Sequence, residues 1–424
     1  MVAEHQQAVC CSFCDSTAMS LIMDFGKVAL AGGFLEPEQF ASESFYPMRL
    51  YFCSDCFGVQ IIDKVNAGVL FRDYFYFSSQ ISTLRNHFAE YAAEVTSRFL
   101  KPAESTVIEF GCNDGVLLRP LADQSIRTVI GVDPATNIVK TIDDPRINVI
   151  NDFFNELVAE QIIARHGKAD MVVANNVFAH IPDIQGITRA VRNVLNDSGV
   201  FIFEVHYLGK MMREMQYDMI YHEHLYYYSL VSLTEHFKRH DMVVFDVKAV
   251  PIHAGSMRYY VCKKGSRHAA AVTPAVSALR DEELGGGFDK KETFARFAAC
   301  VEDRKVKLME LLNRIKAQGK SLAGYGASGR ANTMIQFCGI DHRHLDYMID
   351  DAPAKAGFYT PGSHLLIHHG SILDQPNPPD YLLIFAWSFF DEIAKKCKKY
   401  LQNGGKMIIP LPEVKIVFSE DENF

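Results

Sequence analysis

The sequence lacks several features that mark simple classes of protein. Its 424 residues include one tryptophan, no low-complexity tract and no apolar run long enough to span a bilayer. Positive charge is in deficit: 43 Lys and Arg face 51 Asp and Glu, and the net charge is −8. This balance disfavours a broad nucleic-acid-binding surface. We therefore expect a globular protein that binds neither membranes nor nucleic acids.

The N-terminus also lacks a positively charged segment followed by an apolar one, so no signal peptide is expected. Ten cysteines in a chain of this length do not indicate a secreted disulfide scaffold. We therefore expect a cytoplasmic protein with reduced thiols. The length favours two or three domains, and we expect a monomer or a weak dimer.

Four of the cysteines form two pairs with the same spacing. Two residues separate Cys11 from Cys14, and two separate Cys53 from Cys56. Two such pairs make a closed four-cysteine zinc site, which is structural rather than catalytic. Cys10 is an alternative to its neighbour in the first pair, and unrelated reduced cysteines are the alternative to a metal site. We expect the 38 residues between the pairs to form a small hairpin.

Strand-like and helical segments alternate through the middle of the chain. A helix is expected at residues 84–99, where apolar side chains recur at steps of three and four. The segments that follow have the βαβ rhythm of a parallel sheet. The strand-like runs lie at 106–110, 128–132, 147–150, 170–174, 200–205, 242–247 and 256–262.

A second α/β unit is expected after a long amphipathic helix marked by apolar residues from Phe294 to Ile315. The region around 263–318 is expected to bridge the two units. The strand-like runs of the second unit lie at 321–326, 346–350, 381–387 and 406–411.

The first central strand runs into a glycine-rich turn. Gly111 and Gly115 let the backbone turn sharply and approach a ligand closely, and Asn113 lies between them. The pattern E-x-G-x-x-x-G, which begins at Glu109, differs from the dinucleotide pattern G-x-G-x-x-G. It resembles motif I of class I S-adenosylmethionine (SAM)-dependent methyltransferases. We expect a SAM site, with a glycine turn that binds no ligand as the alternative.

Acidic, aromatic and amide side chains follow the next strands. Asp133 ends the second strand, 22 residues after the first glycine of the turn, where a carboxylate can bind ribose hydroxyls. Asp152 and Phe153 follow the third strand and suit the amine and the ring face of an adenine. Asn175 and Asn176 end the fourth strand. All five are therefore expected to contact SAM.

A polar cluster beyond the fifth strand indicates a catalytic site. Residues 220–229 contain two His, one Glu and four Tyr, and the carboxyl end of this strand should face the cofactor crevice. The two histidines could instead bind a second metal, and the tyrosines could form a buried aromatic wall. The candidates for one shared pocket are Tyr221, His222, Glu223 and His224, together with His180, Tyr74 and Tyr76.

The order of these elements resembles that of the sugar C-methyltransferase family, whose type members make 3-C-methylated deoxysugars such as tetronitrose. The resemblance covers nearly the whole chain. It rests on the paired C-x-x-C knuckles, the aromatic loop at 74–79, EFGCNDG at 109–115, YHEH at 221–224, HAGSMR at 253–258, GYGASGRANT at 324–333 and DDAPAKAGFYTPG at 350–362.

This resemblance implies an α/β fold in three parts. They are a small N-terminal zinc-binding domain (1–70), a central Rossmann-like class I methyltransferase domain that binds SAM (71–262), and a second Rossmann-like domain that helps to bind a nucleotide-sugar (263–424). The implied reaction is methyl transfer from SAM to C3 of a dTDP- or GDP-linked 4-keto-deoxysugar, through an enolate formed by a base, in deoxysugar biosynthesis.

The resemblance also implies roles for individual residues. His224 matches the catalytic base. Tyr221, Glu223, His180 and a tyrosine of the aromatic loop, for which we choose Tyr76, match its pocket. A histidine titrates near neutral pH, and phenols can donate hydrogen bonds to an enolate oxygen.

Other assignments remain open. His222 is the rival for the role of base. Arg330 and Lys355 are the candidate cations for a diphosphate, and Tyr74 is a further candidate for substrate binding. The chain departs from the family in two places: Ala254 stands where the family usually has glycine, and Arg330-Ala331 stand where it favours Lys-Gly.

Three other functions compete with this one. A methyltransferase acting on RNA or protein is disfavoured by the acidic balance. An inactive nucleotide-binding scaffold is disfavoured by the intact motifs around Gly111 and His224. An NAD-dependent reductase that uses GYGASG at 324–329 rests on a short glycine motif, which is weak evidence by itself.

Overall fold

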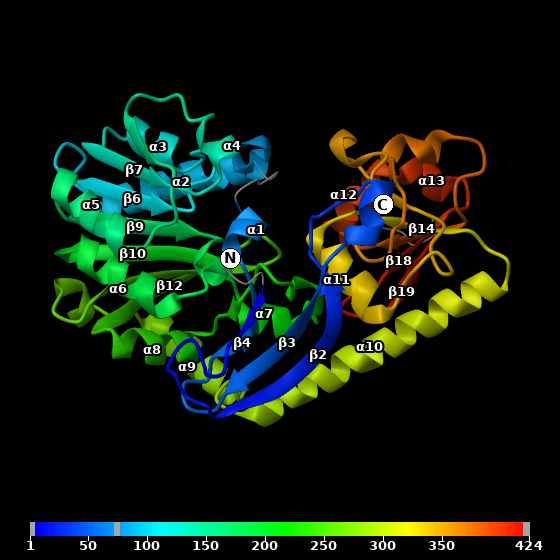
Figure 1. Cartoon of the computed structure of the whole chain (residues 1–424), viewed down its shortest axis with the longest axis horizontal. Coiled ribbons are helices and arrows are strands. Elements are labelled where there is room, and N and C mark those ends of the chain that lie inside the picture. Colours follow the sequence, from blue (N-terminus) through cyan, green and yellow to red (C-terminus); the bar gives the residue numbers. More distant parts are fainter. Residues whose placement is uncertain (1–4, 72–76, 419–424) are drawn as a thin grey trace. The chain divides into compact units, whose positions relative to one another are not determined.

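In the computed structural model, which describes residues 5–71 and 77–418, the chain passes five times between two units (Figure 1). The sequence predicted one bridging region around 263–318, but each unit is built from segments that are distant in the sequence. The domains 1–70, 71–262 and 263–424 stay a prediction. Unit 1 comprises Met1–Ser20, Tyr51–Gly209 and Leu225–Lys291, and unit 2 comprises Leu21–Leu50, Lys210–His224 and Glu292–Phe424.

Unit 1 contains a seven-stranded sheet that includes every strand predicted between residues 106 and 262. Its order is β12-β13-β10-β9-β6-β7-β8. The five strands β10, β9, β6, β7 and β8 are parallel to one another, and β13 runs antiparallel to both β10 and β12. The order reverses between β6 and β9, where parallel sheets bind ligands at their carboxyl ends. The bounds are β6 Thr106–Phe110, β7 Thr128–Val132, β8 Ile147–Ile150, β9 Ala169–Asn175, β10 Leu195–His206, β12 Met242–Val250 and β13 Ser256–Lys263.

Helices pack on both faces of this sheet because alternate strand residues enter different hydrophobic clusters. Val107 joins a cluster with Leu84 and Phe88 of α2, and its neighbour Ile108 joins a cluster with Ile162 of α5. The helix predicted at 84–99 is thereby confirmed. The helices of unit 1 are α1 Ala67–Phe71, α2 Ser82–Phe99, α3 Leu118–Asp123, α4 Thr136–Val139, α5 Glu156–His166, α6 Ile184–Val194, α8 Leu230–Arg239 and α9 Pro274–Gly285.

The segment between the two cysteine pairs forms neighbouring strands of 11 and 9 residues, β2 (Met19–Ala29) and β3 (Phe45–Cys53), longer than the small hairpin predicted. In β3, every second residue from Tyr46 to Phe52 is buried, which is the pattern of a strand with one face in a core. They belong to a four-stranded sheet with the order β11-β4-β3-β2. The other short strands are β1 His5–Gln7, which pairs with β5 Asp63–Val65, and β4 Val59–Ile61 and β11 Tyr226–Tyr227.

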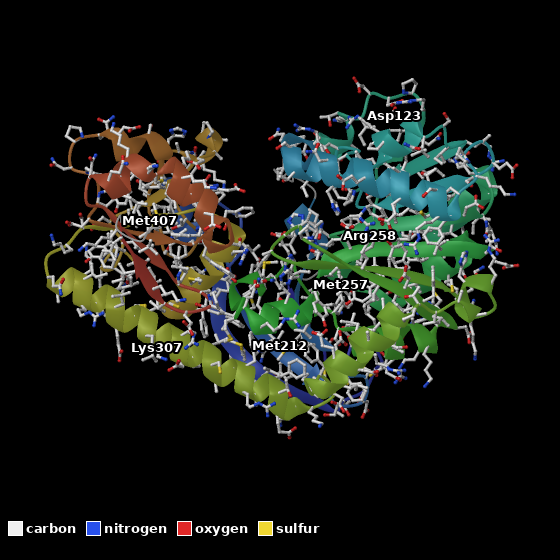
Figure 2. The ribbon with its side chains drawn as sticks, turned by 180° about the vertical axis from the view of Figure 1, so that it is seen from behind. Asp123, Met212, Met257, Arg258, Lys307 and Met407 are labelled. Atoms are coloured by element: carbon white, nitrogen blue, oxygen red, sulfur yellow. The ribbon has the colours of Figure 1, made fainter. Side chains whose placement is uncertain are left out.

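Unit 2 contains a six-stranded sheet with the order β16-β15-β14-β17-β18-β19, parallel except for the edge strand β19. The predicted amphipathic helix precedes it as α10 (Lys291–Ala317). Met407, labelled in Figure 2, lies in the core of this sheet. The other bounds are β14 Leu322–Tyr325, β15 Met348–Asp350, β16 Ile367–His369, β17 Tyr381–Ile384, β18 Lys406–Ile409, β19 Lys415–Val417, α11 Gly329–Cys338, α12 Phe390–Lys396 and α13 Lys398–Gln402, while α7 (Leu208–Arg213) spans the boundary between the units.

Across residues 5–71 and 77–418, no helix combines the length and apolar character needed to cross a bilayer.

Candidate active site

The four predicted zinc ligands lie together in unit 1. The Sγ atoms of Cys11 and Cys56 are 3.5 Å apart, those of Cys14 and Cys53 are 3.7 Å apart, and all four lie within 4.8 Å of one another. A tetrahedral ion with Zn–S bonds of about 2.3 Å requires sulfur atoms about 3.8 Å apart. The cluster therefore fits zinc and uses Cys11 rather than Cys10. In the described part of the chain, no other group of three or more His, Cys, Asp or Glu could hold a metal ion.

A buried amide and a ring support this cluster. Gln60 is fully buried; its Nε2 donates to Cys11 Sγ at 2.9 Å, and its Oε1 accepts from Ser12 N at 3.0 Å. The Phe13 ring packs edge-on against Tyr226 at 5.0 Å. The sulfur atoms thus belong to the same hydrophobic cluster as the strands of the seven-stranded sheet, so zinc stabilises the core of unit 1 as well as its N-terminal segment.

The glycine-rich turn after β6 has the backbone geometry that the motif predicts. Gly111 and Gly115 have φ angles of +66° and +77°. A Cβ at Gly111 would lie 2.6 Å from the side chain of Val177, so this position accepts no larger residue without a shift. Asn113 also has positive φ, and its Oδ1 accepts from Ser78 N at 3.0 Å. The turn is therefore shaped for close approach of a ligand to its backbone.

A buried carboxyl group lies at the end of β6. Glu109 is 2% exposed, and its Oε1 accepts from Asn175 Nδ2 at 3.1 Å. Neither its Oε2 nor Oδ1 of Asn175 has a hydrogen-bond partner. Burial raises the pKa of Glu109 well above its usual range, and the charges of Asp133 and Asp114 raise it further. A cationic ligand such as SAM would satisfy both the unpartnered oxygens and the clustered negative charge.

The other predicted SAM contacts differ in exposure. Asp133 is buried; its oxygens accept from Asn113 N and Ala135 N, each at 2.9 Å, and each oxygen retains a second lone pair. Asp152 is exposed after β8, and its Oδ1 accepts from Phe153 N at 2.7 Å. The Phe153 ring is half-buried.

Two further predicted residues lie beyond β9. Asn176 has a φ of +56°, and its N–H donates to Glu204 O at 2.8 Å. His180 ends a short 3-10 helix, where its ring stacks on Phe71 at 5.6 Å. The carbonyl of Ala179 accepts from Leu225 N at 2.9 Å.

The predicted base lies in a tight turn within unit 2. His224 N donates to Tyr221 O at 2.9 Å, which closes the turn. Its Nδ1 lies 2.9 Å from the carbonyl of Met219, and its Nε2 lies 2.9 Å from the Tyr221 hydroxyl. A carbonyl only accepts, so Nδ1 must carry the proton. In the neutral ring, Nε2 is then the acceptor of the phenol and the position that can take a proton.

His222 and Glu223 occupy the middle of the same turn. His222 is 2% exposed, and its Nε2 lies 3.0 Å from Pro47 O, which fixes that nitrogen as the donor. Glu223 is half-buried. The two histidines thus bond to different parts of unit 2, and they are not part of any metal-binding group in the described residues. Tyr74 and Tyr76 lie outside the described residues.

The two cations predicted to bind phosphate are already paired. Arg330 Nε donates to Asp218 Oδ2 at 2.9 Å. Lys355 Nζ donates to Ala327 O at 2.7 Å and to Asp350 Oδ2 at 3.0 Å. Both cations have partners within unit 2, and their role in binding a diphosphate stays a prediction.

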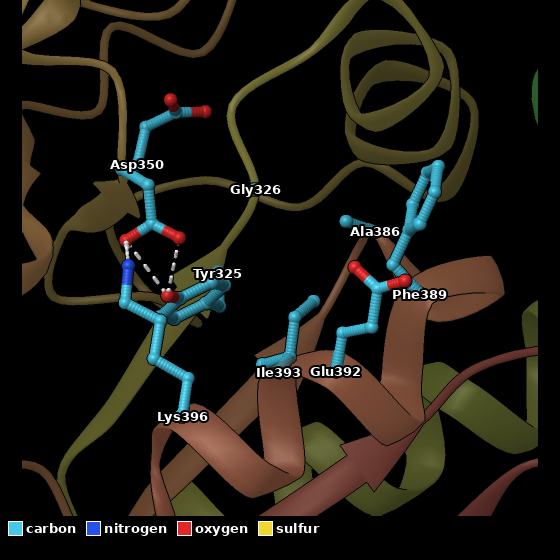
Figure 3. A pocket seen from close by; sticks show the side chains of 9 residues that line it. Tyr325, Gly326, Asp350, Ala386, Phe389, Glu392, Ile393 and Lys396 are labelled. Carbon is cyan, nitrogen blue, oxygen red and sulfur yellow. Dashed lines mark hydrogen bonds and ion pairs between the residues drawn. The ribbon is translucent and has the colours of Figure 1, made fainter. Parts of the chain in front are cut away.

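A pocket of about 410 Å³ lies at the carboxyl ends of β14 and β15 in unit 2 (Figure 3). The Tyr325 hydroxyl donates to both oxygens of Asp351 at 2.9 Å, and Lys396 pairs with the same carboxylate. The charged side chains of the lining are three carboxylates and one ammonium, a set that favours hydroxyl groups over phosphates. The lining residues are Tyr325, Gly326, Asp350, Asp351, Ala386, Phe389, Glu392, Ile393 and Lys396.

Unit 1 contains a buried charged group that was not predicted from the sequence. Arg258, labelled in Figure 2, pairs with Glu204 at 2.6 Å and lies over the Tyr91 ring at 3.6 Å. His87 Nε2 is 2.8 Å from the same carboxylate. Arg258 ends the HAGSMR motif that was identified at 253–258. Its partners belong to no motif, because they lie in an apolar strand and an amphipathic helix. The carboxylate inside the apolar run VFIFEV could have predicted this group, because a buried carboxylate requires a partner.

Three family models match successive parts of the chain. They describe a zinc binding domain (residues 11–71), a methyltransferase domain (84–246) and a C-methyltransferase C-terminal domain (251–412). Over 411 residues the chain is 32% identical to the C-methyltransferase NovU of Streptomyces niveus, which covers 97% of each protein. The chain belongs to the C-methyltransferase family. The protein is a SAM-dependent C-methyltransferase with zinc in its N-terminal region, so the predicted family, α/β fold and cofactors are confirmed.

Other similarities of this C-methyltransferase are partial. A stretch of 98 residues is 34% identical to the ubiquinone biosynthesis O-methyltransferase of Methylobacterium sp. (strain 4-46), which covers 23% of this chain and 39% of that protein. The magnesium protoporphyrin IX methyltransferase ChlM of Synechocystis PCC 6803, crystallised with SAM, covers 42% of this chain and 79% of its own. The TM-score is 0.31 and the identity is 12%.

Proposed function

We propose that the protein transfers a methyl group from SAM to C3 of a nucleotide-linked 4-keto-deoxysugar, with His224 as the base. Transfer to carbon requires a carbon nucleophile, and a C–H bond beside a ketone can supply one by losing its proton to form an enolate. Bound SAM supplies an electrophilic methyl group. The chain must therefore supply a base and a donor for the enolate oxygen.

The observation that carries this proposal is the hydrogen bonding of His224. Its Nδ1 donates to the carbonyl of Met219, so the lone pair lies on Nε2. The Tyr221 hydroxyl donates to that nitrogen at 2.9 Å. On binding, the substrate C–H would take its place, and the phenol could turn to the enolate oxygen. A donor in this role contributes about 3–4 kcal/mol in known oxyanion holes.

The pocket beside Tyr325 supports a nucleoside as the handle of the acceptor. It lies where the strand order of the second sheet reverses, between β14 and β17, which is the usual ligand position in such folds. Asp350 ends β15, the position whose carboxylate binds ribose hydroxyls in related folds. The acidic lining suits ribose better than the diphosphate.

Proton exchange in deuterated water tests the role of His224. The enzyme is incubated with a dTDP-linked 4-keto-6-deoxysugar and S-adenosylhomocysteine, which cannot donate a methyl group. The wild type should exchange the C3 proton, and His224→Gln should lose exchange while SAM affinity stays within about twofold. Normal exchange by His224→Gln together with its loss in His222→Gln would move the role to His222.

A further inference from the structure

One face of helix α11 holds the segment that precedes the predicted base. Arg330 Nε donates to Asp218 Oδ2 at 2.9 Å, and Thr333 Oγ1 donates to Ile220 O at 2.9 Å. The Tyr217 ring packs against Phe337 with ring centroids 5.4 Å apart. Positions 330, 333 and 337 share one side of a helix. All these residues belong to unit 2, as do Met219 and His224.

Asp218 is the charged centre of this contact. It is fully buried, and its Oδ2 accepts both from Arg330 and from Trp387 Nε1, each at 2.9 Å. Its Oδ1 has no hydrogen-bond partner. Buried ion pairs contribute little net stability because both charges lose their hydration, whereas removing one partner alone is strongly destabilising. Such a pair is therefore better explained by the geometry that it fixes.

The pair fixes the position of the backbone carbonyl of the next residue, Met219. Met219 follows Asp218 in the same 3-10 turn, and its carbonyl accepts from His224 Nδ1 at 2.9 Å. Any rotation of the turn moves this carbonyl away from the ring. The ring would then lose the bond that keeps its proton on Nδ1 and its lone pair on Nε2.

We infer that Asp218, held by Arg330 and Trp387, is a positioning residue that fixes the Met219 carbonyl and thereby the tautomer and direction of His224. This inference rests on the proposed role of His224 as the base. It gives Arg330 a role other than phosphate binding. It also anchors the base to α11, the helix that follows the glycine-rich turn of the second sheet.

The test uses full-length Asp218→Asn, Trp387→Phe, Arg330→Met and Arg330→Lys with zinc bound. Each variant is assayed for C3-proton exchange with a dTDP-linked 4-keto-6-deoxysugar and S-adenosylhomocysteine, for kcat and KM of methyl transfer, and for SAM affinity. In parallel, ¹⁵N-histidine NMR reports the tautomer of His224, whose signals are identified by their loss in His224→Gln. Glu43→Gln is the matched control, because Glu43 is a buried carboxylate of unit 2 that pairs with His364 at 2.8 Å.

We expect Asp218→Asn and Arg330→Met to lower exchange and kcat about 10- to 100-fold, with SAM affinity unchanged and the Nδ1–H signal of His224 lost. Trp387→Phe removes one donor only and should have a smaller effect, and Arg330→Lys should partly restore exchange. Glu43→Gln should behave as wild type. If Asp218→Asn does not fold, exchange, kcat and the His224 tautomer are compared with those of the wild type in Trp387→Phe and Arg330→Lys instead.

Retention of the Nδ1–H tautomer and of exchange in these variants would overturn the positioning role. So would a rise in KM for the nucleotide-sugar at constant kcat in the Arg330 variants alone, which would return Arg330 to phosphate binding. Failure of the proposed function looks different: the wild type itself would show no exchange, while the NMR signals would still report whether Asp218 controls the His224 tautomer.

Discussion

Asn175 Nδ2 donates to Glu109 Oε1 at 3.1 Å, while Glu109 Oε2 is buried without a hydrogen-bond partner. Asn175 is the last residue of β9, and Glu109 is the penultimate residue of β6. The order of the sheet reverses between these two strands. An unsatisfied buried oxygen costs about 1–3 kcal/mol, and a bound ligand can remove that cost. The incomplete hydrogen bonding of this pair supports the prediction that SAM binds here.

This pair predicts a link between SAM binding and pH. Burial holds the pKa of Glu109 well above its usual range, so below that pKa the carboxyl keeps its proton. A cationic ligand favours the ionised form, so SAM binding should release a proton and SAM affinity should rise with pH. Glu109→Gln should weaken binding by about 1.5–3 kcal/mol and flatten this dependence. Calorimetry in buffers of different ionisation heat measures the number of protons released on SAM binding. Asp143→Asn is the control, because Asp143 is exposed.

Much of this site was predictable because short-range patterns encode it. The E-x-G-x-x-x-G turn, the strand ends at Asp133 and Asn175, and the C-x-x-C pairs depend on local spacing alone. Each was identified from the sequence, and the structure brings the four cysteines together. The roles of the other residues in binding SAM stay a prediction. The seven strands of the first sheet and four strands of the second were predicted because buried strands read as continuous apolar runs. The short edge strands β16 and β19 of the second sheet were not predicted.

The residues that the sequence did not reveal depend on contacts between distant segments. Asp218 meets Arg330 and Trp387 across more than a hundred residues of chain. Strand β3 lies between the two cysteine pairs, and the spacing of those pairs predicted a small hairpin there but not a nine-residue strand. Nothing local indicates that the segment of His224 belongs to unit 2.

A second prediction concerns zinc retention. Gln60 Nε2 donates to Cys11 Sγ at 2.9 Å, a bond that stabilises a thiolate. Gln60→Ala should weaken zinc binding about 10- to 100-fold, by analogy with other residues that support metal ligands. Competition with a chromophoric chelator measures the change. Exposed Gln402→Ala should bind zinc as the wild type does, and equal affinities for both variants would contradict the role of Gln60.

A third prediction is an acid-dependent loss of stability from His236. Burial lowers the pKa of His236 to about 3, so the native state keeps this ring neutral. The unfolded state takes up the proton near its ordinary pKa of about 6.5, and the contribution is complete above that pH and lost as pH falls towards 3. At pH 5 the loss is about 2 kcal/mol. Urea unfolding at pH 7 and pH 5 measures how much the free energy of unfolding falls between the two pH values. This fall should be about 2 kcal/mol smaller for His236→Gln than for the wild type.

A fourth prediction follows from the family departure at Ala254. Its φ is +62°, a left-handed conformation that glycine adopts readily and alanine does not. Ala254→Gly should raise the free energy of unfolding by about 0.5–1 kcal/mol, because relief of strain exceeds the added entropy of the unfolded chain. At exposed Ala356, where φ is −64°, the same change should lower stability. Urea unfolding that shows a loss at Ala254 would contradict this explanation.

The position of the transferred methyl group distinguishes methyl transfer to C3 from transfer to any other atom of the sugar. The enzyme is incubated with SAM carrying a ¹³C-methyl group and with dTDP- and GDP-linked 4-keto-deoxysugars, and the product is examined by carbon–proton correlation NMR. We expect one labelled methyl group bonded to C3, with the C3 proton absent. A labelled methyl group on oxygen or nitrogen, or on any other carbon of the sugar, would contradict it.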